Sequence, residues 1–433
     1  MRINRDRYLK KLISKKENGL IKVITGIRRC GKSYLLFKIY KEYLNNNGVD
    51  NKHIINLALD ELSNARYRNP LELDRYVRSL LNNDGKMNYV FLEEIQKVVD
   101  IQNPYIDDPN ERIGFVDVLL GLMKEPNVDL YVTVSNSKML SSDILTEFKD
   151  RGDEIRVNPL SFREFYDVYE GNKLYAWQDY YTYGGMPLVV LKKTDEEKIE
   201  YLKELFKKTY ITDVINRHRI TQDREVLEEL LNIISSSIGS LTNPSKLAKT
   251  FKSIKNISIN STTISKYLDY FKDAFIIDKA YRYDIKWKKY IDTPMKYYYT
   301  DVGLRNARLN FRQQEENHIM ENILYNELVM RGFNVDIGVV EYNYKDEKGK
   351  SKRSQLEVDF VANKGSSRYY IQCALSVDEE SKRIQETNSL NRINDSFKKI
   401  VVVKDIMKPW KDDKGILYVG IQQFLLDENM INL

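Results

Sequence analysis

The stretch 26–33, GIRRCGKS, has the spacing G-x-x-x-x-G-K-[ST]. It follows a β-branched run, IKVITG, and precedes an apolar-periodic segment, so we expect a strand, a loop and then a helix. Glycines let successive backbone N–H groups turn toward phosphate oxygens, and the helix adds the positive end of its dipole. Lys32 would neutralise phosphates and Ser33 would ligate Mg²⁺. The sequence therefore predicts a site for ATP and Mg²⁺ that is formed by Gly26, Ile27, Arg28, Arg29, Cys30, Gly31, Lys32, Ser33 and Tyr34.

Two acidic residues end an apolar strand that is expected at 88–96, NYVFLEEIQ. In one sheet with the phosphate-binding strand, the first acid would reach the Mg²⁺ shell and the second the attacking water. We therefore expect Glu93 to be the metal-side carboxylate and Glu94 to be the water-activating base.

Two further residues are candidates for the same reaction. The strand expected at 128–136 ends at Ser135 and Asn136, where a polar side chain could orient the water or cap the next helix. Arg151 follows that helix on an expected turn, from which it could stabilise phosphate charge in a neighbouring subunit. These two assignments rest on spacing alone.

A carboxylate-bearing strand is expected near the C-terminus, in 355–374, QLEVDFVANKGSSRYYIQCA. From residue 315 the expected order is helix, strand, charged turn 345–353, two strands, helix and strand. This order resembles the core of PD-(D/E)xK nucleases, whose carboxylates hold Mg²⁺ beside a lysine. Glu321 and Asp359 stand in the expected places, with Glu357 on the same strand face as Asp359.

The second half of that nuclease centre is missing. Gln372 and Ala374 occupy the positions where Glu and Lys are needed, and no spacing argument favours Lys382 as a substitute. Glu321, Asp359 and Gln372 are thus interpreted as the remnant of a nuclease site, in a domain that has lost its activity.

The middle of the chain predicts a module that contacts DNA. Residues 231–300 give three helices and then two strands, the order of a winged helix-turn-helix. The third helix would enter the major groove with Lys266 and Tyr267, and the wing would be 282–289, which includes Trp287. Residues 241–310 hold 14 Lys and Arg against 6 Asp and Glu, a footprint for polyanions. The possible DNA contacts are Lys246, Lys266, Lys286, Lys288 and Lys289.

Composition excludes several protein classes. The 433 residues carry a net charge of +6 and are 42% hydrophobic, which is typical of a soluble globular protein of two to four domains. The longest apolar runs are strand-sized, far below the roughly 20 residues of a membrane helix. Two cysteines and three histidines do not suit a disulfide framework or a zinc cluster. Because the N-terminus also lacks a secretory signal, we expect a cytoplasmic protein that does not contact membranes.

The sequence as a whole resembles bacterial and archaeal AAA+-type ATPases whose P-loop domain precedes a C-terminal domain of unknown function. The resemblance rests on VITGIRRCGKS, FLEEIQ, YVTVSNSKMLSSDI, RVNPLSFREFY, YGGMPLVV, TDVGLRNA and LEVDFV, in this order. It implies that Asn136 is the sensor-1 residue and that Arg151 is an arginine finger. Two positions depart from the family's pattern, Glu93 in place of Asp and Val134 in place of Gly.

We therefore expect a multidomain α/β protein. Residues 1–165 would form an AAA+-like P-loop NTPase domain with a parallel sheet, and 166–230 a helical lid over the nucleotide. Residues 231–310 would form the winged helix, and 311–433 a restriction-endonuclease-like α/β domain without activity.

The expected function is hydrolysis of ATP with Mg²⁺, coupled to rearrangement of DNA or of a DNA-bound partner. Two alternatives remain open, an endonuclease that ATP regulates and a nucleotide-dependent protein-binding switch with little turnover. A protein partner and assembly with further copies of the chain also remain open.

Overall fold

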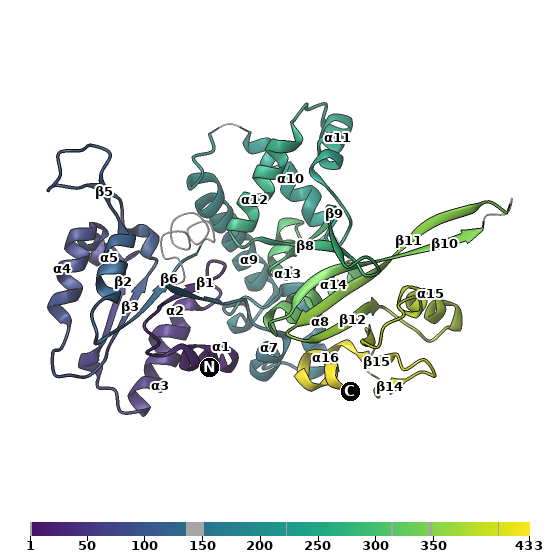
Figure 1. The fold of residues 1–433 in the computed structure, drawn as a ribbon, viewed down its shortest axis with the longest axis horizontal. Coiled ribbons are helices and arrows are strands. Elements are labelled where there is room, and N and C mark those ends of the chain that lie inside the picture. The colour runs from purple at the N-terminus through teal and green to yellow at the C-terminus, as the bar shows by residue number, and fades with distance from the viewer. Residues whose placement is uncertain (1, 136–150, 222, 313–314, 346–348, 406) are drawn as a thin grey trace. The chain divides into compact units, whose positions relative to one another are not determined.

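The computed structural model describes every residue except 1, 136–150, 222, 313–314, 346–348 and 406. The chain forms two compact units, shown in colour from N- to C-terminus in Figure 1. The first, the N-terminal unit, comprises residues 1–159 and 273–275, and the second, the C-terminal unit, comprises 160–272 and 276–433. Each unit is described by itself.

The N-terminal unit is built on a five-stranded parallel sheet of order β2-β3-β6-β1-β7. Its strands are β1 (Ile21–Thr25), β2 (Ile54–Ala58), β3 (Asn88–Glu93), β6 (Val128–Thr133) and β7 (Gly152–Arg156). Its helices are α1 (Asp6–Lys15), α2 (Lys32–Tyr34), a π-helical segment (Leu35–Tyr40), α3 (Lys41–Asn46), α4 (Pro70–Leu80) and α5 (Phe115–Met123). A short hairpin, β4 (Ile101–Gln102) and β5 (Arg112–Ile113), follows β3.

Helices cover both faces of this sheet, and the strands therefore bury nearly every side chain. On one face, strand residues such as Val23 and Val132 pack with Leu73 of α4 and Leu119 of α5. The opposite face contacts the helical run that begins at Lys32, through aromatic pairs such as Tyr40 with Tyr131. Burial on both faces explains why these strands read as continuous apolar runs.

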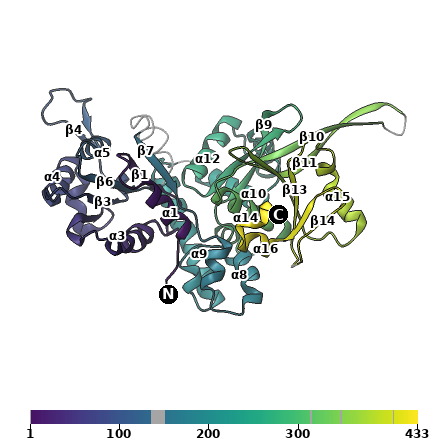
Figure 2. The same ribbon diagram turned by 60° about the horizontal axis from the view of Figure 1, so that its bottom comes forward.

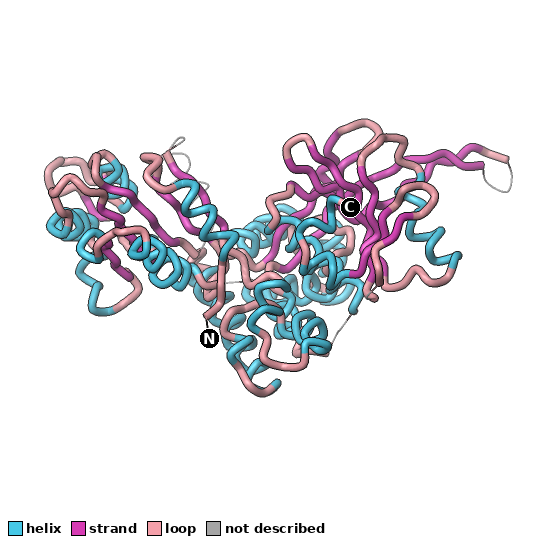
Figure 3. Tube along the Cα trace, turned by 90° about the horizontal axis from the view of Figure 1, so that it is seen from below, coloured by secondary structure: helices cyan, strands magenta, loops and turns pink. Residues whose placement is uncertain are grey.

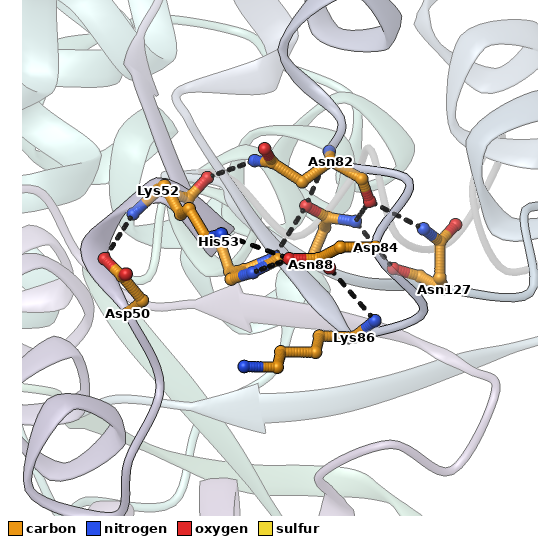
Figure 4. A network of polar contacts seen from close by, with 8 residues as sticks. All are labelled: Asp50, Lys52, His53, Asn82, Asp84, Lys86, Asn88 and Asn127. Atoms are coloured by element: carbon orange, nitrogen blue, oxygen red, sulfur yellow. Dashed lines mark hydrogen bonds and ion pairs between the residues drawn. The ribbon is translucent and has the colours of Figure 1, made fainter.

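A polar network joins the starts of β2, β3 and β6 (Figure 4). The side-chain amide of Asn88, at the start of β3, donates to the carbonyls of Asn82 (2.9 Å) and Asn127 (3.3 Å). His53, before β2, lies 3.3 Å from the Asn88 side-chain oxygen. Asn88 is fully buried, so these bonds satisfy a group that would otherwise be costly to bury.

The C-terminal unit begins with helices α7 (Phe162–Val168), α8 (Ala176–Tyr183), α9 (Asp195–Thr209), α10 (Arg224–Ser236), α11 (Pro244–Lys255) and α12 (Ser261–Asp273). Two motifs of the sequence resemblance meet here, at the end of α8 and the start of α13 (Val302–Arg308). Asp301 caps α13 through the Leu304 N–H (3.0 Å) and accepts the Gly185 N–H (2.7 Å). The motifs YGGMPLVV and TDVGLRNA therefore form one structural junction.

The same unit holds an eight-stranded mixed sheet of order β14-β15-β13-β12-β11-β10-β8-β9. Its strands are β8 (Ile277–Asp284), β9 (Lys289–Tyr299), β10 (Asn334–Lys345), β11 (Ser351–Lys364), β12 (Ser367–Ala374), β13 (Lys398–Val403), β14 (Trp410–Lys411) and β15 (Leu417–Gly420). The remaining helices are α14 (Glu316–Met330), α15 (Glu380–Asn391) and α16 (Ile421–Leu426). Figure 2 shows α15 beside this sheet, and Figure 3 shows its strands in magenta with the β10–β11 hairpin extending beyond them.

The expected fold class is confirmed as a parallel α/β sheet followed by a separate unit with a mixed sheet. Two details differ from the sequence expectation. The strands expected as a wing, β8 and β9, belong to the C-terminal sheet, since β8 pairs in parallel with β10. Part of the charged turn expected at 345–353 is strand, because β10 and β11 remain paired to Lys345 and Ser351. The domain boundaries at 165, 230 and 310 stay predictions.

Candidate functional site

The loop 26–33 joins the end of β1 to the start of the helix at Lys32. Gly26 has a φ of +138°, and a Cβ at this position would lie 2.1 Å from the Val157 carbonyl oxygen, so only glycine fits. Gly31 has a φ of +100° and precedes Lys32 without any side-chain capping bond. The first N–H groups of the helical run 32–46 thus face the loop, as an anion-binding helix start requires.

Lys32 points into this loop. Its side-chain amine donates to the carbonyls of Gly26 (2.9 Å) and Ile27 (3.3 Å), and the residue is 5% exposed. Cys30 is fully buried and its thiol donates to the Val157 carbonyl (3.2 Å). The structure therefore gives Lys32 the central position in the loop and Cys30 a packing role.

Ser33 and Glu93 meet at the mouth of the loop, where the Ser33 hydroxyl donates to Glu93 Oε1. Burial raises the pKa of Glu93 to about 7, and the negative charges of Asp60 and Glu94 add to the effect. A cation at this point would relieve that repulsion. The hydroxyl and carboxylate oxygens are also ligands that Mg²⁺ prefers.

Glu94 follows directly and is held by three other side chains. Its φ of +52° is left-handed, and its N–H donates to Thr133 Oγ1 at 2.9 Å. Glu94 Oε2 accepts from the Ser135 hydroxyl (3.1 Å) and from the Gln96 amide. Because β6 lies between β3 and β1 in the sheet, Ser135 occupies the place predicted for a polar residue between the two strands.

Of the other two candidates, only Arg151 is described, and it does not lie at this site. Asn136 lies outside the described residues. Arg151 is exposed and precedes β7, where its carbonyl accepts the Ile21 N–H (3.0 Å) at the start of β1. Since Ile21 and the loop lie at opposite ends of β1, Arg151 is about 16 Å of strand away from Lys32.

The residues present fit ATP and Mg²⁺. The loop offers N–H groups and an ammonium to phosphates, and Ser33 with Glu93 would offer two oxygen ligands to the metal. Sequence reasoning missed Asp60 and Gln96. The signal for Asp60 was an acid two residues after the apolar strand 54–58, which neighbours β3.

The lysines predicted to contact DNA lie on three elements of the C-terminal unit. Lys286, Lys288 and Lys289 are exposed at the turn between β8 and β9, beside Trp287, which is 59% exposed. Lys246 on α11 and Lys266 on α12 are also exposed. The β8–β9 turn therefore presents three cations and one aromatic ring to the solvent.

Other parts of the DNA prediction need correction. Tyr267 is buried and its hydroxyl donates to Asp223 at 2.8 Å, because it shares the inner face of α12 with Ile264 and Phe271. Part of the basic surplus of 241–310 is internal as well, since Lys296 and Arg305 are buried.

The acidic residues predicted as a nuclease remnant lie together, in a group that we call the C-terminal cluster. It comprises Glu321 on α14, Glu357 and Asp359 on β11, Gln372 on β12 and, unexpectedly, Lys296 on β9. Gln372 Oε1 accepts the Asp359 N–H at 3.4 Å. Lys382, the candidate substitute lysine, instead lies 3.6 Å from Glu379 and is 55% exposed.

Three protein families match successive parts of the chain. An AAA domain matches residues 18–166, a domain of unknown function (DUF8612) matches 174–315, and a second domain of unknown function (DUF4143) matches 316–424. An uncharacterized protein of Haemophilus influenzae is 31% identical over 98% of both chains. An uncharacterized protein of Methanocaldococcus jannaschii is 29% identical over 88% of this chain and 79% of its own length.

Solved structures give more distant matches. The Aeropyrum pernix ORC2 protein in its ADP form is 13% identical, with a TM-score of 0.35 over 75% of this chain and 95% of that one. The replication initiator DnaA bound to AMPPCP and single-stranded DNA is 14% identical, with a TM-score of 0.30 over 61% and 86%. Across the described residues, no helix is long and apolar enough to cross a membrane.

Proposed function

We propose that this chain, which belongs to the family of proteins that join an AAA domain to DUF8612 and DUF4143, is an ATPase. It binds ATP with Mg²⁺ and hydrolyses the terminal phosphoanhydride bond. One observation carries the proposal. Ser33 and Glu93 touch at the mouth of the glycine loop, and Glu94 is held beside them by Ser135.

Each side chain has a distinct part in this reaction. Lys32 and the N–H groups of the loop bind the β- and γ-phosphates, and Ser33 and Glu93 hold the metal. When bound, Mg²⁺ would offset the charge that builds on the phosphate oxygens. Glu94 accepts a proton from the attacking water, and its bonds to Ser135 and Gln96 keep its carboxylate aimed. Ser135 is thus a positioning residue.

The output of the reaction is proposed to be rearrangement of DNA or of a DNA-bound protein. Support comes from the β8–β9 turn, where Lys286, Lys288 and Lys289 stand exposed beside Trp287. Phosphates attract such cations in any sequence, and an exposed ring can stack on an unpaired base. The expected result is an ATPase rate that rises when DNA is added.

Steady-state ATPase and nucleotide-binding assays test the hydrolysis. Lys32→Ala should lose nucleotide binding and turnover together. Glu94→Gln should keep ATP binding and lose turnover by about 10²-fold or more, because an amide cannot accept the proton. Ser135→Ala should lower kcat by about 10-fold with KM unchanged, since it only aims Glu94. Glu111→Gln, an exposed acid of the same unit, is the matched control.

Two results would contradict the proposal. Turnover that survives in Glu94→Gln would remove the assigned base. Tight ATP binding without turnover in the wild-type protein would favour the alternative of a nucleotide-dependent switch. The DNA part is tested separately with duplex and single-stranded DNA, and a rate that neither form changes would reject it.

A further inference from the structure

Lys296 is a buried cation whose amine reaches two carboxylates of the C-terminal cluster. Its Nζ lies 2.8 Å from Glu321 Oε1 and 2.6 Å from Glu357 Oε1. The side chains of Lys296 and Glu321 are 4% and 6% exposed, whereas Glu357 is 33% exposed. Glu321 also accepts from the Tyr298 hydroxyl at 2.5 Å. The ammonium therefore sits between the acids, where a nuclease centre would hold its metal.

The remaining acid of the cluster, Asp359, is hydrogen-bonded to the backbone. Asp359 Oδ2 accepts the backbone N–H of Cys373 at 2.7 Å. Burial raises the pKa of Asp359 well above its usual range, and the charge of Glu321 adds to the effect. Burial would lower the pKa of Lys296, but the acids Glu321, Asp359 and Glu357 outweigh it and raise the pKa. Lys296 accordingly keeps its proton over the physiological range.

The donor set does not fit a divalent metal. Among the residues that the structure describes, no group of three or more His, Cys, Asp and Glu is arranged to hold a metal ion. Gln372 and Ala374 supply no charge, and Gln372 is engaged by the Asp359 N–H. A buried ammonium beside two carboxylates already supplies part of the positive charge that a metal would bring.

We infer that the ammonium of Lys296 fills the cation position of the C-terminal cluster, which is therefore an internal ion-pair centre that excludes divalent metal. Lys296 belongs to the segment that matches DUF8612, and the acids belong to the segment that matches DUF4143. The two segments are also tied by Asn322 of α14, which bonds the N–H (2.8 Å) and the carbonyl (2.7 Å) of Tyr299. The cluster thus joins β9 to the C-terminal fold.

Lys296→Met tests this inference, because it removes the charge and keeps a long apolar side chain. Without metal, the buried Glu321 loses its counter-charge, and the melting temperature should fall by roughly 10 °C. Mn²⁺ should restore most of that loss in Lys296→Met and leave the wild-type melting temperature unchanged. Both chains carry Ser33→Ala and are studied without nucleotide, so that metal at the glycine loop does not contribute.

Two variants keep the test decisive. Lys289→Met removes an exposed lysine of the same strand and should change neither the melting temperature nor the response to Mn²⁺. Lys296→Met combined with Glu321→Gln removes both buried charges, so it should regain stability without metal. If Lys296→Met does not fold, this double variant decides, because a double variant that also fails to fold contradicts the charge-based account.

Three other results would overturn the inference. The first is Mn²⁺ binding by the Ser33→Ala protein, measured by electron paramagnetic resonance, that disappears in Asp359→Asn. The second is metal-dependent cleavage of plasmid DNA that is lost in Lys296→Met, which would make Lys296 a nuclease lysine. The third is a Lys296→Met protein that melts as the wild type does.

Discussion

Glu93 and Glu94 are adjacent in sequence but lie in different surroundings. Burial with Asp60 and Glu94 nearby raises the pKa of Glu93 to about 7, whereas Glu94 accepts two side-chain hydrogen bonds. The Glu93 carboxylate is therefore suited to binding a cation, and the Glu94 carboxylate is held in one orientation. The sequence gives both acids the same local pattern, and only the positions of β2 and β6 beside β3 distinguish them.

Asp301 provides a pH-dependent test at the same scale. Its pKa is raised to about 6 by complete burial, even though the N–H groups of Gly185, Leu304 and Gly303 bond it. Because the folded chain holds this proton more tightly than the unfolded chain, stability falls as the pH rises from about 4 to about 6. The loss amounts to about 3 kcal/mol, which persists above that window.

Asp301→Asn removes this titration, so comparison with the wild type isolates it. The wild-type unfolding free energy minus that of Asp301→Asn should fall by about 3 kcal/mol between pH 4 and pH 7. Urea denaturation at several pH values measures the difference. Asp292→Asn, on an exposed acid of β9, should give a difference that does not vary with pH. A flat difference for Asp301→Asn would contradict the assignment.

At the scale of elements, the β8–β9 turn is expected to carry the affinity for DNA. Replacing Lys286, Lys288 and Lys289 with Ala should weaken binding to all duplex sequences. It should also lower the slope of log affinity against log salt by about 3, because each lost phosphate contact releases about 0.9 fewer counterions. Fluorescence anisotropy at several salt concentrations measures both quantities.

A second lysine triplet provides the control for that experiment. Lys203, Lys207 and Lys208 are exposed on α9 of the same unit, and their replacement changes the net charge equally. If the α9 triplet weakens binding as much as the β8–β9 triplet does, long-range attraction rather than the turn explains the affinity. If both variants keep the wild-type slope of log affinity against log salt, the proposal that the protein acts on DNA is contradicted.

The elements that the sequence predicts are those whose signal is local. The strand, loop and helix around Gly26–Ser33 were expected and are confirmed, as is the strand order from β10 to β13. The apolar periodicity of α12 also predicts that Tyr267 is buried, because it lies three residues after Ile264 and so on the same face of the helix. In contrast, the pairing of β8 with β10 and the position of Lys296 depend on contacts between distant segments. No local pattern encodes such contacts.

At the scale of the whole molecule, Arg151 bears on whether the chain works as an assembly. It is exposed just before β7, at the end of the parallel strands away from Lys32, so its guanidinium cannot reach the nucleotide of its own loop. In a head-to-tail assembly, the edge of one subunit can meet the loop of the next. Arg151→Ala should then abolish turnover while leaving ATP binding intact.

Mixing two inactive chains tests this directly. Lys32→Ala lacks a working loop but retains Arg151, and Arg151→Ala has the opposite defect. In a random equal mixture, about one interface in four pairs an intact loop with an intact Arg151, so about a quarter of the wild-type ATPase rate should return. Mixing Lys32→Ala with Glu94→Gln is the control and should return nothing, because both defects lie in the same loop site. An Arg151→Ala protein with a wild-type rate would exclude Arg151 from catalysis, whereas two chains that stay inactive on mixing would show that no subunit completes the site of another.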